Sequence, residues 1–307
     1  MLRTRLRDFV ITDDDWIFAV ADYSHEEGIR SVLRYVPDQK GTRGTDKKFR
    51  KLEFDDAFIF MKQTRPEWVK DVHIVPYDRV KQVLAPNEKI PALTRENKKV
   101  REIVKALEKD IPLDKMGVTG SLLPGLQNET SDIDFIIYGK SWFRARDIIA
   151  QAKKGNTALT EISNEMWQDI YKKRRPEISF DEFLIHELRK GNRGMVDGTY
   201  FDLLYVRDWE DITPFKRGVD IGHATIEATV TNADFSFDSP AIFKVDHPEI
   251  SCVLSYTHTY AGQALAGERI EASGMVETVG DIKRLVVGTK REPKGEWIRS
   301  LTLLEKS

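Results

Sequence analysis

The sequence lacks the features that mark secreted, membrane-spanning and zinc-stapled proteins. Cys252 is the single cysteine, which excludes an intramolecular disulfide and a cysteine-rich zinc site. No apolar run approaches the roughly 18–20 residues that cross a bilayer, and the basic start MLRTRLRDFVI has no apolar signal core. We therefore expect a cytoplasmic protein, with no membrane partner and with Cys252 buried in a strand.

A strong excess of one charge is also missing. The 307 residues carry a formal net charge of −2, so any nucleic-acid contact would need a local basic patch. Hydrophobic residues make up 40% of the chain, which is enough for ordinary cores. At roughly 100–200 residues per domain, this length predicts two or three domains.

Composition divides the chain into three expected domains of an α+β protein. Residues 1–93 are expected to form a small α+β domain that includes a helix at Tyr77–Leu84, after Pro76. Residues 94–217 are expected to form a central domain with a mixed sheet and flanking helices. Residues 218–307 are rich in short strands with glycine-containing turns, which suggests a small closed, OB-like β-barrel.

The most informative stretch is Gly117–Tyr138, whose sequence is GVTGSLLPGLQNETSDIDFIIY. It predicts a strand, a tight turn at Gly120 and Ser121, a loop and a second strand. A glycine turn can approach phosphates closely. Asp132 and Asp134 are spaced i and i+2, so both would leave one face of a strand and suit a hard cation such as Mg²⁺. A phosphate cradle with paired metal ligands is what nucleotidyl transfer requires. The alternative is a solvated strand end.

A third aspartate, Asp202, lies inside the apolar strand pattern TYFDLLYV. A buried charge in such a strand is costly unless it is paired or bound to a metal. Asp202 is therefore a candidate metal ligand. The alternative is a partly exposed strand residue or a salt-bridge partner of Arg207 or Arg193.

Gly120, Ser121, Asp132 and Asp134 resemble the signature of the DNA polymerase beta nucleotidyltransferase superfamily, which includes tRNA nucleotidyltransferases and poly(A) polymerases. The whole-chain layout is similar to predicted nucleotidyltransferases of archaeal genomes. The resemblance implies two Mg²⁺ ions bridged by Asp132 and Asp134, with Asp202 binding the second ion and orienting or deprotonating the attacking hydroxyl. It also implies that Gly120 and Ser121 hold the β- and γ-phosphates while pyrophosphate leaves.

Basic residues before the Asp202 strand are candidate phosphate ligands. Arg189 and Arg193 are expected to bind the nucleotide triphosphate, with Lys190 beside them, although Glu187 could pair with these side chains instead. The run Lys172–Arg175 would neutralise phosphates of a nucleic-acid acceptor. Its alternative is a solvated helix end.

In the expected barrel, a strand is predicted at Cys252–His258, and Tyr256, His258 and Tyr260 alternate as if on one face. Such aromatics can stack on bases, although a half-buried barrel face is the alternative.

Together these features predict a Mg²⁺-dependent enzyme that transfers a nucleoside monophosphate from an NTP such as ATP to a hydroxyl acceptor. RNA is the first expected acceptor, and a small molecule or protein side chain is the rival. A nucleotide- or RNA-binding module with a vestigial site is the alternative from another class.

Overall fold

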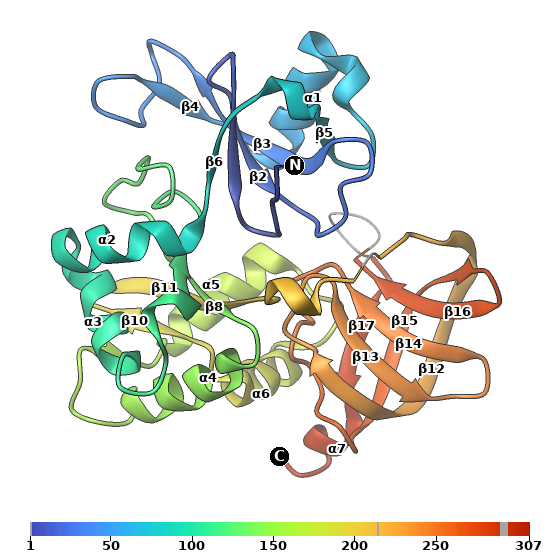
Figure 1. Ribbon diagram of the computed structural model, residues 1–307. Coiled ribbons are helices and arrows are strands. Elements are labelled where there is room, and N and C mark those ends of the chain that lie inside the picture. The colour runs from blue at the N-terminus through green and yellow to red at the C-terminus, as the bar shows by residue number, and fades with distance from the viewer. Residues whose placement is uncertain (1, 214, 289–293) are drawn as a thin grey trace. The chain divides into compact units, whose positions relative to one another are not determined.

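The computed structural model describes residues 2–213, 215–288 and 294–307, and they form two compact units (Figure 1). The first unit comprises residues 1–161 and 192–215, and the second comprises residues 162–191 and 216–307. The division into three domains stays a prediction. Helices and strands are mixed throughout, which confirms the α+β class.

Seven α-helices lie in the described residues: α1 (Phe54–Thr64), α2 (Ile90–Glu96), α3 (Lys98–Leu107), α4 (Ser141–Ala152), α5 (Asn164–Arg174), α6 (Phe180–Lys190) and α7 (Leu301–Leu304). Within these parts of the chain, no helix combines the length and the apolar content needed to cross a bilayer.

The first sheet belongs to the N-terminal part of the first unit. Its strands are β1 (Phe9–Thr12), β2 (Ile17–Val20), β3 (Ile29–Pro37), β4 (Phe49–Lys51), β5 (His73–Val75) and β6 (Val80–Leu84). They run in the order β4-β3-β2-β1-β6, and β5 pairs with β3. The predicted helix at Tyr77–Leu84 was wrong. Only a short 3-10 turn, Tyr77–Arg79, follows Pro76, because the next residues pair with β1 as strand β6.

The second sheet contains the stretch that the sequence singled out. Its strands are β7 (Met116–Val118), β8 (Ile133–Tyr138), β9 (Leu159–Thr160), β10 (Arg193–Val196) and β11 (Thr199–Val206), in the order β7-β8-β11-β10-β9. Strands β8 and β11 are parallel neighbours. Helix α4 packs on both of them, and its buried Trp142 indole donates a hydrogen bond to the Leu203 carbonyl at 3.2 Å.

The third sheet belongs to the second unit. Its strands are β12 (Val219–Phe235), β13 (Ala241–Asp246), β14 (Ile250–Ser255), β15 (Arg269–Val279), β16 (Ile282–Val287) and β17 (Trp297–Ser300). They follow the order β12-β13-β14-β16-β15-β17, and β12 also pairs with β15 (Figure 1). Cys252 lies half-buried in β14.

The strand expected at Cys252–His258 is shorter than predicted, because β14 ends at Ser255. Tyr256, His258 and Tyr260 therefore follow the strand in a turn and do not share one strand face. Tyr260 is buried, and its hydroxyl accepts a hydrogen bond from the Glu177 backbone at 3.2 Å. The prediction that these three side chains alternate along one strand was therefore wrong.

Candidate active site

The glycine turn after β7 is held against the next strand. The Thr119 backbone N–H donates to the Asp134 carbonyl at 2.9 Å, and the Leu126 N–H closes the turn on the Ser121 carbonyl at 2.8 Å. Gly120 has a φ of +62°, and a Cβ at this position would lie 2.2 Å from Asp134 Oδ2. Glycine is needed here for both reasons, since other residues avoid positive φ and their side chains would collide with the carboxylate.

Two of the three candidate carboxylates meet because β8 and β11 are parallel and in register. Asp134 pairs directly with Asp202, so their side chains leave the same face of the sheet at the same level. The prediction that Asp132 also lies in this strand was wrong, because pairing with β11 begins at Ile133; Asp132 is exposed and immediately precedes β8. The fold thereby brings the Gly120-Ser121 turn next to β8 and β11, two strands that lie far apart in the sequence.

Asp202 is buried and already has polar partners. The Asn192 side-chain amide donates to its Oδ1 at 2.9 Å, and Arg193 Nε donates to Oδ2 at 3.1 Å. Arg193 is also buried, and although burial alone would lower the pKa of its guanidinium, the Asp202 carboxylate raises it. The ion pair with Arg193, one of the alternatives for Asp202, is therefore present.

Asp134 differs from Asp202 in its electrostatic setting. Its side chain is half-buried and makes no hydrogen bond or ion pair within residues 2–213, 215–288 and 294–307. Burial raises the pKa of Asp134 to about 6; the negative charges of Asp202 and Asp132 act in the same direction, and Arg7 opposes them. A carboxylate in this setting gains from any cation that approaches it.

The donors fit a magnesium ion at Asp134 and its neighbour Asp132. Both offer carboxylate oxygens, which Mg²⁺ prefers, and the missing Cβ of Gly120 leaves Asp134 Oδ2 accessible from the turn. A preformed group of three metal-ligating side chains is not found in the described part of the chain. Asp202 is instead held by Asn192 and Arg193.

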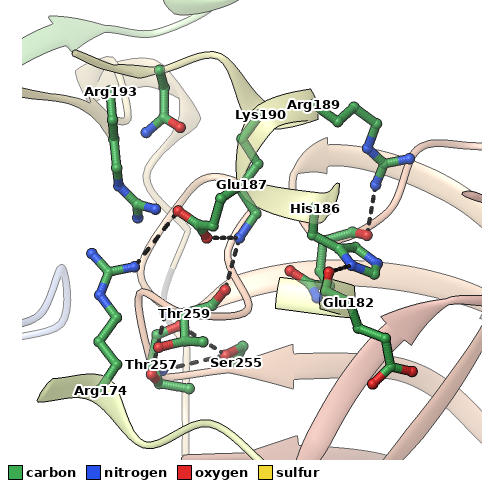
Figure 2. Close-up of polar contacts among 12 residues, drawn as sticks. Arg174, Glu182, His186, Glu187, Arg189, Lys190, Arg193, Ser255, Thr257 and Thr259 are labelled. Carbon is green, nitrogen blue, oxygen red and sulfur yellow. Dashed lines mark hydrogen bonds and ion pairs between the residues drawn. The ribbon is translucent and has the colours of Figure 1, made fainter. Parts of the chain in front are cut away.

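The other predicted phosphate ligands lie in the second unit (Figure 2). Arg189 donates from Nη1 to both Glu268 oxygens, at 2.6 and 2.8 Å, and from Nη2 to the Gln263 carbonyl. Lys190 donates to Glu187 Oε1 and to the Thr259 carbonyl, each at 2.7 Å. These contacts hold α6 against its own unit, so Glu187 does pair with a neighbouring cation.

The basic run Lys172–Arg175 lies at the end of α5. Lys172 is exposed and is 3.6 Å from Asp169, whereas Arg174 lies 3.8 Å from the buried Glu187 (Figure 2). Part of the run is therefore a solvated helix end, and part belongs to the interior of the second unit.

Sequence reasoning missed Asn192 and two N-terminal arginines, Arg7 and Arg34. Both arginines act electrostatically on Asp134, although they lie about 100 residues or more before it in the sequence. Neither belongs to a motif, so no local pattern could have found them.

Comparison with known proteins identifies a nucleotidyltransferase domain in this part of the chain. The family model of the nucleotidyltransferase domain matches residues 98–185, a span that contains the glycine turn and Asp134. The chain is 37% identical over 338 residues to an uncharacterized protein of Methanocaldococcus jannaschii, and the match covers 97% of this chain and 99% of that protein. No solved structure matches the chain significantly.

Proposed function

The chain belongs to the DNA polymerase beta-like nucleotidyltransferase superfamily, and from this premise we propose that it transfers a nucleoside monophosphate from an NTP to a hydroxyl acceptor, releasing pyrophosphate. The observation that carries the proposal is the register of β8 and β11. It sets Asp134 beside Asp202, next to the Gly120-Ser121 turn.

The turn and nearby basic side chains would bind the triphosphate. Backbone N–H groups of Gly120 and Ser121 would donate to phosphate oxygens, because the turn exposes main chain without a blocking Cβ. Arg193 would exchange its contact with Asp202 for a phosphate. Arg189 would need to leave Glu268 to take part, which makes it the weaker candidate.

The carboxylates would hold two Mg²⁺ ions, with Asp132 and Asp134 as the principal ligands. Bound Mg²⁺ would neutralise phosphate charge and lower the pKa of the attacking hydroxyl. Asp202, once released by Arg193, would ligate the second ion and accept the proton of that hydroxyl. Asn192 would keep the Asp202 carboxylate oriented through its hydrogen bond to Oδ1.

An RNA acceptor is our first proposal for the hydroxyl donor. Pairing of β12 with both β13 and β15 makes a ring of strands, β12-β13-β14-β16-β15, which supports a small OB-like barrel. Barrels of this kind bind single-stranded nucleic acid through a groove on one face.

A vestigial nucleotide- or RNA-binding module is the second candidate. The ion pair between Arg193 and Asp202 favours it, because a carboxylate held by arginine is not free to ligate a metal. In that case the site would bind an NTP without turning it over.

One assay separates the two functions: incubation with α-labelled NTPs, Mg²⁺ and total cellular RNA, beside Asp134→Asn and Asp202→Asn. Transfer by the wild type alone is the result expected of the enzyme. Asp202→Asn should keep NTP binding and lose turnover. NTP binding by the wild type, with no label reaching RNA, protein or small metabolites, would overturn the transferase proposal and favour the binding module.

A further inference from the structure

The N-terminal segment reaches the glycine turn through its main chain. The Arg7 carbonyl accepts a 2.7 Å hydrogen bond from Thr119 Oγ1, on the residue just before Gly120, and the Arg7 N–H donates to the Val20 carbonyl at 2.9 Å. Arg7 has a φ of +72°, a left-handed conformation that is unfavourable for residues other than glycine. The fold therefore fixes Arg7 beside the turn at a cost in backbone strain.

The N-terminal sheet also packs directly on the turn. Leu123 and Leu126, which follow Ser121, share one buried cluster with side chains of the N-terminal sheet, namely Phe9, Ile17, Tyr35 and Phe49. Arg43 adds hydrogen bonds from Nη1 to the Leu126 carbonyl at 3.3 Å and to Ser131 Oγ at 3.1 Å. The turn and the N-terminal sheet thus form one packed body.

A second arginine on this sheet, Arg34, occupies an irregular position in β3. Ile17 pairs with Tyr35 and the adjacent Phe18 pairs with Leu33, so Arg34 is an extra residue, as in a β-bulge. Bulges redirect a side chain away from the regular alternation of a strand. Arg34 is half-buried, and its neighbour Tyr35 is one of the residues that pack against the turn.

Arg7 and Arg34 share an unusual lack of partners. No hydrogen bond or ion pair of either guanidinium exists among the residues that the structure describes, and Arg7 Nε is buried without an acceptor. Arg30, on the same strand as Arg34, is instead paired with Asp22 and Asp71.

Both charges act on the active-site carboxylate. The Asp134 carboxylate experiences the positive charges of both Arg7 and Arg34. Each guanidinium therefore lies within electrostatic range of the carboxylate next to the glycine turn.

We propose that Arg7 and Arg34 bind the triphosphate of the incoming nucleotide, so that the N-terminal sheet is part of the nucleotide site. This inference rests on the proposed transferase function. A guanidinium presents a planar fork of donors that matches phosphate oxygens. Among the described residues neither of these two forks has a hydrogen-bond or ion-pair partner, and both belong to the N-terminal part that packs on the turn. The rival role is neutralisation of the three carboxylates alone.

The test measures equilibrium binding to the full-length protein with Mg²⁺, using a non-hydrolysable ATP analogue, inorganic tripolyphosphate and adenosine. Arg7→Gln and Arg34→Gln should each weaken binding of the first two ligands roughly 10- to 100-fold, the effect of losing a hydrogen bond to a charged group. Adenosine affinity should not change. Arg65→Gln is the matched control, because Arg65 lies in the same N-terminal part and pairs with Asp14.

Two results would overturn the inference. One is unchanged affinity for tripolyphosphate in both variants. The other is equal weakening for adenosine, which would indicate a general structural role. If the arginines only neutralise carboxylates, both variants should bind Mg²⁺ alone more tightly and the ATP analogue as before. Where a glutamine variant fails to fold, Arg7→Lys or Arg34→Lys, which keeps the charge, replaces it in the same binding measurement.

Binding and turnover separate this inference from the proposed function. Wild-type transfer of label, with arginine variants that bind tripolyphosphate normally, would overturn the role of the arginines and leave the transferase intact. Arginine-dependent binding of tripolyphosphate without any transfer would overturn the transferase and leave the anion site intact.

Discussion

Replacing Asp134 by asparagine should stabilise the metal-free protein while it removes the proposed activity. The wild-type carboxylate is half-buried beside two other carboxylates, and its pKa is raised from 3.8 to about 6. A difference of about two pKa units corresponds to about 3 kcal/mol, and partial solvent exposure reduces this to about 1–3 kcal/mol. Asparagine has nearly the same shape and carries no charge to desolvate.

The gain in stability of Asp134→Asn over the wild type should depend on pH in a defined direction. Between about pH 4 and pH 6 the folded protein binds a proton at Asp134 that the unfolded chain has released, so wild-type stability falls as pH rises through this window. The advantage of Asp134→Asn is therefore full above about pH 6. It shrinks as pH falls and vanishes below the ordinary pKa of the carboxyl group.

Thermal melting at pH 8 and pH 4 measures this difference. At about 2–4 °C for each kcal/mol, Asp134→Asn should melt several degrees above the wild type at pH 8, in the presence of a chelator. Asp147→Asn is a suitable control, because Asp147 is an exposed carboxylate on α4. Its effect should stay within about 0.5 kcal/mol.

Magnesium should remove the advantage of the variant. With Mg²⁺ and a non-hydrolysable NTP at 100 times the dissociation constant, the wild type gains about 2.7 kcal/mol of stability that the variant lacks. Equal melting temperatures at pH 8 without metal would contradict the electrostatic setting assigned to Asp134. An identical Mg²⁺-dependent rise in both proteins would contradict its role as a metal ligand.

Three further changes test other parts of the fold. Asp8→Asn should stabilise the protein by up to about 4 kcal/mol above pH 7, because burial raises the pKa of Asp8 to about 7 from 3.8; the gain should fade between about pH 7 and pH 4 in urea unfolding. Glu187→Gln should lower the free energy of unfolding by about 3–5 kcal/mol in denaturant melts, because it leaves the Lys190 ammonium buried without its carboxylate. Breaking the exposed ion pair of Asp169 with Lys172 should lower it by less than about 0.5 kcal/mol. Leu123→Ala should cost about 2–5 kcal/mol by the same measurement, and equal stability would show that the turn does not depend on the N-terminal sheet.

Local signals in the sequence were sufficient for the glycine turn. Gly120 adopts a positive φ and approaches the Asp134 carboxylate closely, and only glycine allows both. The residue types along this stretch were therefore enough to predict the turn. The amphipathic stripe of α3 was equally local, and Val100, Ile103, Val104 and Leu107 are all buried. The strand carrying Asp202 was visible as an apolar run, although its neighbour in the sheet was not.

Patterns failed where a partner distant in sequence decided the outcome. Val80–Leu84 forms a strand because it pairs with β1 in the N-terminal sheet. The helix and strand propensities of these residues alone could not reveal that pairing. The contacts of α6 are another feature that local patterns do not encode, because Arg189 and Lys190 donate hydrogen bonds to backbone carbonyls near residue 260.

By itself, the sequence determined the glycine turn and the spacing of the aspartates that follow it, because these features depend on neighbouring residues and on the intrinsic dihedral freedom of glycine. Tertiary structure alone decided which side chains surround them. Parallel pairing of β8 with β11 set Asp202 beside Asp134, and the packing of Leu123 against the N-terminal sheet brought Arg7 and Arg34 to the same place. Such contacts depend on long-range packing and register, which no spacing of residues along the chain encodes locally.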